Sequence, residues 1–215
     1  MTERVQKTLD FLRSKFDGNE YYRTRPADKA YRWEHSLRVA KIGADIAAAE
    51  GLDAEAMTVA GLLHDVYYGC DFPEGYDWAE HGRDGAKMAR PFVESLGFPP
   101  ETAEDILYGI AIHVDDRAEF PGRRNPFTLT VGEADNIDRF DVFRIYDNLR
   151  WKDFYNMTLD ERIEWLEGLL PRMEKLRGTE FSTKTAQTMW REKVDYQLDF
   201  HRRLLEQMRA GQALE

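Results

Sequence analysis

Histidine and aspartate side chains that could hold a metal ion recur along the middle of the chain. Four of the five histidines lie between residues 35 and 113, and the helical period places each one on the apolar face of its own segment. Two aspartates share this placement. The full set is His35, His64, Asp65, His81, His113 and Asp135. Because a buried imidazole or carboxylate is destabilising without a partner, this pattern is best explained by a shared cation that satisfies all six side chains.

Each of these residues has an ordinary structural explanation when it is taken alone. A single histidine on an apolar face is more often a core residue that is hydrogen-bonded to the backbone. Asp65 could cap a helix, and Asp135 could pair with Arg139 one turn further on. Several such coincidences together are much rarer than one, so we prefer the metal site. Imidazole and carboxylate ligands without a thiolate favour iron or manganese, with nickel, cobalt and zinc as alternatives.

The overall composition limits the classes of protein to which this chain can belong. It has 215 residues and a net charge of −10, so it can bury a substantial core but repels the backbone of nucleic acids. Its single cysteine, Cys70, fits a reducing compartment. The sequence has no apolar run of the roughly 20 residues that a membrane span requires. We therefore expect a cytoplasmic protein, not inserted in a membrane, that acts on a small molecule as a monomer or a homodimer.

Apolar spacing is helical along almost the whole chain, which predicts an all-α fold. We expect one domain over residues 1–215, with a core of about 28–150 and a C-terminal helical extension of about 151–215. Capping residues, prolines and glycines define where the helices begin and end. The predicted helices are 2–16, 29–50, 54–64, 79–97, 99–114, 130–149, 159–177 and 183–209.

Three local features are specific enough to be checked. The helix at 130–149 is expected to begin at Thr130, because Thr130 and Glu133 match a capping box. The aromatic segment 67–79 also contains glycine and proline, so it is expected to form a loop or lid. The predicted apolar stripe of the helix at 29–50 consists of Leu37, Val39, Ile42 and Ile46.

Three runs of this sequence resemble the HD superfamily of metal-dependent hydrolases. They are HSLRVA (35–40), AGLLHD (60–65) and EADNID (133–138), in the order His, then His-Asp, then a distant Asp. The resemblance covers about residues 30–145 and implies a helical HD-domain bundle. It implies that one metal is held by His35, His64, Asp65 and Asp135. It also implies that His81 and His113 hold a second metal, with Asp65 bridging the two.

The resemblance further implies hydrolysis of a phosphoester or phosphoanhydride bond, in a nucleotide or another small phosphorylated metabolite. Two divalent cations around Asp65 would lower the pKa of a water and neutralise phosphoryl oxygens. Asp138 lies one turn after Asp135 and is expected to relay a proton or orient a ligand. Positive charge for the substrate phosphate is expected from Arg38, Arg117, Arg123 and Arg124, each of which could instead be an ordinary solvated arginine.

Two other functions remain open. Some members of the superfamily use the same six ligands around a mixed-valent di-iron centre and act as oxygenases, and the ligand set does not separate them from hydrolases. Others have lost ligands and act as non-enzymatic binding modules, which the complete set in this chain opposes. The run VYYG (66–69) after His-Asp lacks the glycine-lysine pair of the cyclic-dinucleotide phosphodiesterases in this group, so that activity is not expected.

Overall fold

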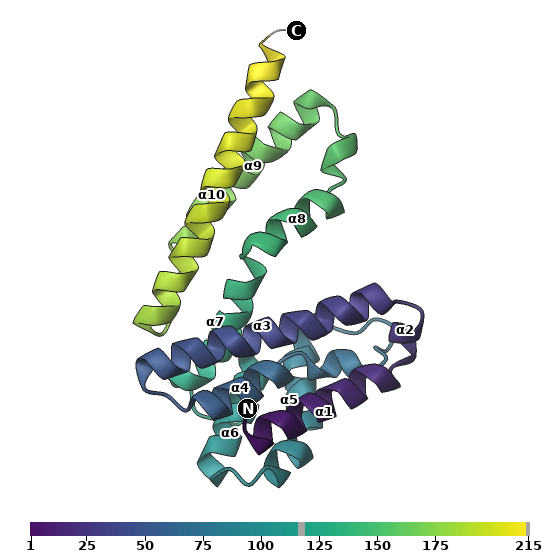
Figure 1. Cartoon of the computed structure of the whole chain (residues 1–215), viewed down its shortest axis with the longest axis vertical. Helices are drawn as coiled ribbons and strands as arrows, with labels where there is room; N and C mark the ends of the chain where they lie inside the picture. The colour runs from purple at the N-terminus through teal and green to yellow at the C-terminus, as the bar shows by residue number, and fades with distance from the viewer. Residues whose placement is uncertain (116–118, 214–215) are drawn as a thin grey trace. The chain divides into compact units, whose positions relative to one another are not determined.

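The computed structural model describes residues 1–115 and 119–213, and within these ranges it contains helices and turns but no strand (Figure 1). The predicted all-α fold is confirmed. The chain divides into two compact units, Met1–Asp138 and Arg139–Glu215. The single domain with a core at 28–150 stays a prediction. None of the described helices is both long enough and apolar enough to cross a bilayer.

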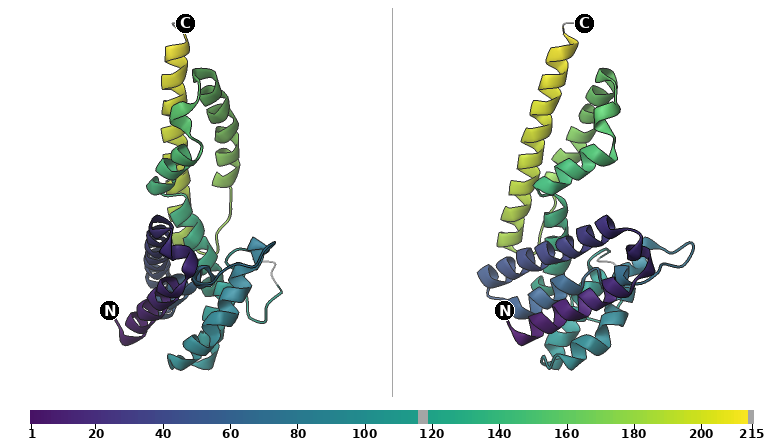
Figure 2. Two further views of the ribbon diagram at one scale, coloured as in Figure 1. Left: turned by 90° about the vertical axis from the view of Figure 1, so that its right-hand side faces the viewer. Right: turned by 45° about the vertical axis from the view of Figure 1, so that its right-hand side comes forward.

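The first unit is a bundle of helices around the central helix α4. Its helices are α1 (Glu3–Gly18), α2 (Glu20–Arg23), α3 (Pro26–Glu50), α4 (Ala54–Leu63), α5 (His81–Ser95), α6 (Pro100–Ile112) and α7 (Pro126–Arg139). Short 3-10 turns, η1 (Val66–Gly69) and η2 (Trp78–Glu80), interrupt the connection between α4 and α5. Helix α4 contacts α1, α3 and α6, and Figure 2 shows α1 and α3 on one side of this unit with α5 and α6 on the other.

Local capping signals account for several helix ends in this unit. Asp53 accepts a hydrogen bond from Ala56 N at 2.9 Å and so caps the start of α4, as predicted. Gly51 ends α3 with a φ of 71°, in the left-handed region where a side chain would be strained. Pro100 occupies the first position of α6, where its missing N–H is not needed.

The predicted helix at 130–149 was wrong in its start and in its continuity. Helix α7 begins at Pro126, because Asn125 and Thr128 form reciprocal side-chain to backbone hydrogen bonds of 3.0 Å that cap it. The Thr130 hydroxyl donates to Pro126 O at 2.7 Å, so Thr130 lies inside the helix. The segment then breaks after Arg139, and Asp141 caps a separate helix, α8 (Val142–Trp151).

Close packing of α3 on α4 depends on a glycine. A Cβ atom on Gly61 would lie 2.7 Å from Ala40 Cα, well inside normal contact. The two backbones therefore approach each other closely at this crossing. Val39 and Ile46 of the predicted stripe are buried in this region, but Leu37 is 37% exposed, so its place in the stripe was wrong. Ser36 and Ala40 are buried instead, because small side chains fit this narrow contact.

The second unit is a helical hairpin with a short helix at its start. It contains α8 (Val142–Trp151), a 3-10 turn η3 (Phe154–Asn156), α9 (Leu159–Arg177) and α10 (Lys184–Gln212). Helices α9 and α10 run antiparallel and bury Ile163, Leu166 and Leu205 between them (Figure 1). The Thr158–Glu161 capping box at the start of α9 is present, as predicted. This unit therefore has its own small core.

Candidate metal centre

The six histidine and aspartate side chains singled out in the sequence meet inside the first unit. His35 comes from α3 and Asp135 from α7, whereas His81 opens α5. His64 directly follows α4, and His113 directly follows α6. Each of the six residues is buried, with exposed fractions from 0% for His64 to 9% for His81. Helix ends and helix faces thus bring together groups that are up to 100 residues apart along the chain.

All four imidazoles are held through their Nδ1 atoms. His64 Nδ1 donates to Gly61 O at 2.7 Å, and His113 Nδ1 donates to Ile110 O at 2.7 Å. His81 Nδ1 donates to Trp78 O at 2.5 Å. His35 Nδ1 instead lies 2.7 Å from Asp138 Oδ2. Because a carbonyl or carboxylate oxygen only accepts, each Nδ1 atom carries a proton and each ring turns its Nε2 atom toward the centre.

Asp65 lies between two pairs of these imidazoles, and each of its oxygens faces one pair. Asp65 Oδ2 is 3.6 Å from His35 Nε2 and 3.3 Å from His64 Nε2. Asp65 Oδ1 is 3.2 Å from His81 Nε2 and 3.5 Å from His113 Nε2. This is the geometry of a carboxylate that can bridge two neighbouring cations.

Asp135 completes only one of the two groups. Its Oδ1 atom lies 3.1 Å from His35 Nε2 and 3.9 Å from His64 Nε2. Ligand atoms of His35, His64 and Asp135 lie within 4.8 Å of one another, as do those of His64, Asp65 and His113. Asp135 therefore adds a carboxylate beside the imidazoles that face Asp65 Oδ2.

The donor set fits a metal ion better than it fits a metal-free hydrogen-bond network. His81 Nε2 and His113 Nε2 are 3.2 Å apart, and both face Asp65 Oδ1. With Nδ1 protonated, these three atoms are all acceptors and repel one another. A cation with bonds of about 2.1 Å separates adjacent ligands by about 3.0 Å in an octahedron and about 3.4 Å in a tetrahedron. Most of the observed separations, 3.1–3.6 Å, lie close to this range.

The charges of the ligands are strongly coupled. Burial opposes ionisation of Asp65, but His64 and Arg32 hold the pKa of this carboxyl well below its usual range. Burial also opposes ionisation of Asp135, but the hydrogen bond to His35 outweighs it and lowers the pKa of this carboxyl to about 2. Burial also opposes protonation of His35, yet hydrogen bonds to Asp135 and Asp138 raise its pKa to about 9. Both carboxylates are therefore ionised at neutral pH and attract a cation or a proton.

Asp138 and Arg38 act on the centre through His35. Asp138 accepts from His35 Nδ1, and its other oxygen accepts from Arg38 Nε at 2.6 Å. The Arg38 guanidinium also donates to Asp138 Oδ2 at 3.1 Å. This arrangement fits Asp138 as a group that orients a ligand, one of the two roles predicted for it. Arg38 is engaged with that carboxylate, so its role toward a substrate phosphate stays a prediction.

Of the arginines predicted on the loop before α7, Arg123 has its partner on α6 and not at the centre. Arg123 donates to Asp105 Oδ2 at 3.2 Å, and its side chain is 71% exposed. Arg124 is also exposed. Arg117 lies outside the described residues. Their role in binding phosphate stays a prediction.

Sequence reasoning missed Arg32 and Tyr68, which lie beside the centre. Arg32 donates to Asp65 Oδ2, and its guanidinium lies 3.6 Å from the centroid of the Tyr68 ring. The Tyr68 ring makes an edge contact with the His81 imidazole, with 5.2 Å between centroids. One available signal was that Arg32 lies one turn before His35 and so shares its helix face. The cationic Arg32 is thus already next to the carboxylate that links both histidine pairs.

Two further glycines allow the ligand-bearing helices to approach. A Cβ on Gly82 would lie 2.8 Å from Ala111 O and 3.1 Å from His113 Nδ1. A Cβ on Gly132 would lie 2.8 Å from His113 O. His113 therefore sits where α5, α6 and α7 meet at distances that only glycine permits without a shift.

Comparisons with known proteins agree with this geometry. A family model described as HD domain matches residues 32–142 of the chain. Ribonuclease Y of Mycoplasma mycoides is 33% identical over 116 residues, which cover 48% of this chain and 27% of that protein. Ribonuclease Y of Cutibacterium acnes is 31% identical over 83 residues, covering 39% of this chain and 14% of that protein. The chain thus spans about a quarter or less of the length of these curated relatives.

A solved structure is similar along almost the whole chain. The crystal structure of a predicted HD superfamily hydrolase from an uncultured Thermotogales bacterium matches with a TM-score of 0.64 and 19% identity. The match covers 94% of this chain and 91% of that one. At this level of identity, the likeness shows the shared fold.

Proposed function

The chain belongs to the HD domain family, and from this membership we propose that it is a metal-dependent hydrolase of phosphoester or phosphoanhydride bonds. The substrate we propose is a small phosphorylated metabolite, with nucleotides among the candidates. The observation that carries the proposal is the convergence of four imidazole Nε2 atoms on the two oxygens of Asp65. Bound cations would stabilise such a buried set of imidazole nitrogens and carboxylates. Without cations, burying these polar groups together would destabilise the core.

Two cations would be held, with Asp65 shared between them. His35, His64 and Asp135 would complete the first site, and His81 and His113, which both face Asp65 Oδ1, the second. Iron and manganese suit these ligands best, and nickel, cobalt and zinc also fit them. When bound, such cations supply positive charge that lowers the pKa of water and stabilises a phosphoryl group under attack.

The protein's own residues would hold this arrangement in place. Asp138 accepts the Nδ1 proton of His35 and so directs its Nε2 atom toward the metal position. Low pKa values keep Asp65 and Asp135 ionised at neutral pH. Arg32 lies against Asp65 and can offer its remaining N–H groups to a substrate phosphate, which suits the planar guanidinium.

The size of the substrate is the main difference from the curated relatives. Ribonuclease Y is by its name an enzyme that acts on RNA, whose bonds are also phosphoesters. This chain carries a net charge of −10, which opposes binding of a long polyanion at physiological salt. A small phosphorylated molecule bound by local cations avoids this repulsion.

Metal analysis combined with a substrate screen tests the proposal. The full chain is purified anaerobically, its metal content is measured, and nucleotides, dinucleoside polyphosphates and sugar phosphates are screened with manganese, iron or nickel. Asp65→Ala should lose bound metal and turnover while keeping its helical circular dichroism. Asp45→Ala is the matched control, because Asp45 is exposed on the same unit and its carboxylate accepts from Lys41 on the surface of α3.

Three results would contradict the proposal. Unchanged turnover in Asp65→Ala would show that hydrolysis does not depend on the candidate metal centre. Oxygen uptake that requires iron, without release of phosphate from any compound, would favour the di-iron oxygenase. If the protein contains no metal and gains no thermal stability from manganese or iron, a non-enzymatic binding module becomes the better explanation.

A further inference from the structure

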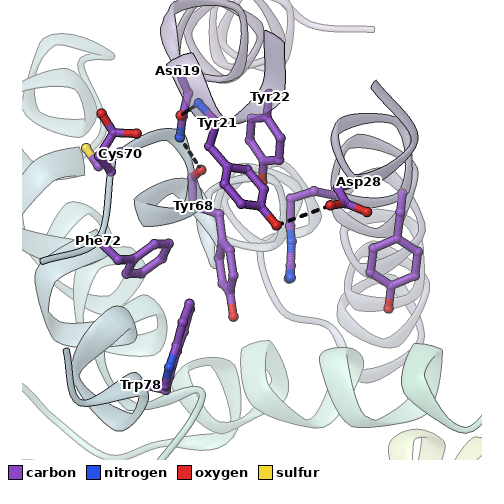
Figure 3. Close-up of a pocket in the computed structure, with 11 residues that line it drawn as sticks. Asn19, Tyr21, Tyr22, Asp28, Tyr68, Cys70, Phe72 and Trp78 are labelled. Carbon is purple, nitrogen blue, oxygen red and sulfur yellow. Dashed lines mark hydrogen bonds between the residues drawn. The ribbon is translucent and has the colours of Figure 1, made fainter. Parts of the chain in front are cut away.

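A cavity lined with aromatic side chains opens beside the candidate metal centre. Its volume is about 630 Å³, within the range of ligand pockets for small molecules. Its lining residues come from α2, from the first half of α3 and from the connection between α4 and α5 (Figure 3). We call it the aromatic pocket, and it is lined by Asn19, Tyr21, Tyr22, Asp28, Tyr31, Arg32, Tyr68, Cys70, Asp71, Phe72 and Trp78.

The aromatic pocket and the metal centre share a wall. Arg32 lines the pocket and donates to Asp65 at the centre. Tyr68 also lines the pocket, and its ring touches that of His81. A substrate whose phosphate lies at Arg32 and Asp65 would therefore place the rest of the molecule in the pocket.

The walls of the pocket offer ring faces that are available for stacking. Trp78 is 55% exposed and Tyr21 is 46% exposed, so a ligand can reach these rings. Phe72 packs against Trp78, with 4.4 Å between ring centroids, and so supports it from one side. Figure 3 shows the Tyr68 ring between Tyr21 and the Phe72–Trp78 pair in this view.

Two of the polar groups at the pocket are carboxylates, whose oxygens accept hydrogen bonds. Asp28 and Asp71 are exposed carboxylates that can accept N–H groups from a ligand. Asp28 already accepts from the Tyr21 hydroxyl at 3.2 Å. Burial raises the pKa of Tyr22 to about 12, so this phenol stays neutral. Asp28 and Asp71 thus suit a flat ring whose edge carries N–H donors.

A cationic ligand, such as a quaternary ammonium, is the obvious competitor for an aromatic pocket with carboxylates. Two guanidinium groups already occupy ring faces here. Arg32 lies 3.6 Å from the centroid of Tyr68, and Arg25 lies 4.2 Å from the centroid of Tyr21. An added cation would meet these like charges, whereas a neutral planar ring can stack beside a guanidinium without repulsion.

We propose that the aromatic pocket binds the heterocyclic base of a nucleotide, with an N–H-bearing edge toward Asp71 or Asp28 and the phosphate at Arg32 and the metal centre. This inference rests on the proposed hydrolase function, because that function places the phosphate. It narrows the substrate class from small phosphorylated metabolites to nucleotides whose base carries an exocyclic amino group.

The single cysteine of the chain provides a direct probe of pocket occupancy. Cys70 is half-buried and lines the pocket, so its alkylation rate reports on access to this site alone. Burial raises the pKa of its thiol, so the reaction with iodoacetamide is run at a fixed alkaline pH. Guanosine, adenosine and cytidine should each slow alkylation at least fivefold in the metal-loaded full chain. Ribose and choline should have little effect.

Two substitutions and a control then locate the contact. Trp78→Ala should raise the nucleoside concentration for half protection about tenfold, as expected for the loss of one base–aromatic stack. Asp71→Asn should weaken protection by guanosine several-fold. Trp151→Ala is the control, because Trp151 is 79% exposed, lies in the other compact unit and does not line the pocket. Each variant is compared with its own ligand-free rate.

The outcomes separate this inference from the proposed function. Equal protection by ribose and nucleosides, or no effect of Trp78→Ala, would overturn the base pocket even if the protein hydrolyses phosphate compounds. Stronger protection by choline would overturn it in favour of a cation pocket. If nucleosides protect Cys70 but the protein hydrolyses none of the screened compounds, the base-binding pocket is supported and the proposed hydrolase function is contradicted.

Discussion

Replacing Gly61 with alanine tests whether the approach of α3 to α4 sets the geometry of the metal centre. The new Cβ would lie 2.7 Å from Ala40 Cα and 3.0 Å from Ala40 N. Because non-bonded carbons approach to about 3.5 Å, the two helices must separate by roughly 0.8 Å at this crossing. Gly61 O also accepts from His64 Nδ1, so the shift is passed to a ligand.

The change in the free energy of unfolding caused by Gly61→Ala is the difference between two opposing effects. Overpacking of this kind destabilises by about 1–3 kcal/mol, whereas alanine is favoured over glycine inside a helix by about 1 kcal/mol. The net loss in the free energy of unfolding should therefore reach about 2 kcal/mol at most. His64 Nε2 and His35 Nε2, now 3.2 Å apart, would separate beyond the roughly 0.2 Å that a metal site tolerates. We expect metal affinity to fall at least about tenfold.

Urea unfolding and calorimetric titration with manganese measure the two effects separately. Gly168→Ala is the matched control, because Gly168 lies within α9 and nothing would lie within 4 Å of its Cβ. That variant should be more stable by up to about 1 kcal/mol and should bind manganese as the wild type does. If Gly61→Ala were also stabilised and kept its metal affinity, the argument from helix approach would be refuted.

Three further predictions concern the residue that orients His35, a helix cap and a buried histidine. Asp138→Asn replaces the carboxylate that accepts from His35 Nδ1 with a neutral amide. Manganese affinity measured by calorimetry should therefore fall about tenfold. An unchanged affinity would contradict the orienting role of Asp138. Asp53→Ala removes the acceptor for the Ala56 N–H, which should lower the urea-derived free energy of unfolding by about 1 kcal/mol. Burial lowers the pKa of His201, so the unfolded chain binds this proton more readily and stability falls as the pH drops below 6.5. In His201→Gln that fall should be shallower in unfolding curves at pH 7.5 to about 5, and an identical pH profile would exclude His201 as its source.

Helix ends that depend on near neighbours could be predicted from the sequence. Asp53 caps α4 and Thr158 caps α9 through bonds that span three residues, so the signal and the structure share the same short window. The start of α7 could not be chosen in this way. Two competing caps, at Asn125 and at Thr130, lie within six residues of each other, and only the packed structure selects the earlier one.

The aromatic segment after Asp65 shows the same limit. Its composition predicted a loop or lid, and residues 70–77 do form a loop between the short 3-10 turns η1 and η2. The sequence did not reveal that Tyr68 would lie against Arg32 and beside His81. Contacts of this kind depend on the positions of α2 and α3, which are distant in the chain from this segment.

From the sequence alone, the helical class of the fold and the six polar side chains on apolar helix faces were accessible, because both follow from periodicity within single helices. Tertiary structure alone decided how these groups face one another. It set Asp65 between two histidine pairs, engaged Arg38 with Asp138 and placed Arg32 beside Asp65. The physical reason is that such distances depend on helix crossings, where one missing Cβ, as at Gly61, moves two backbones relative to each other by a large fraction of an ångström.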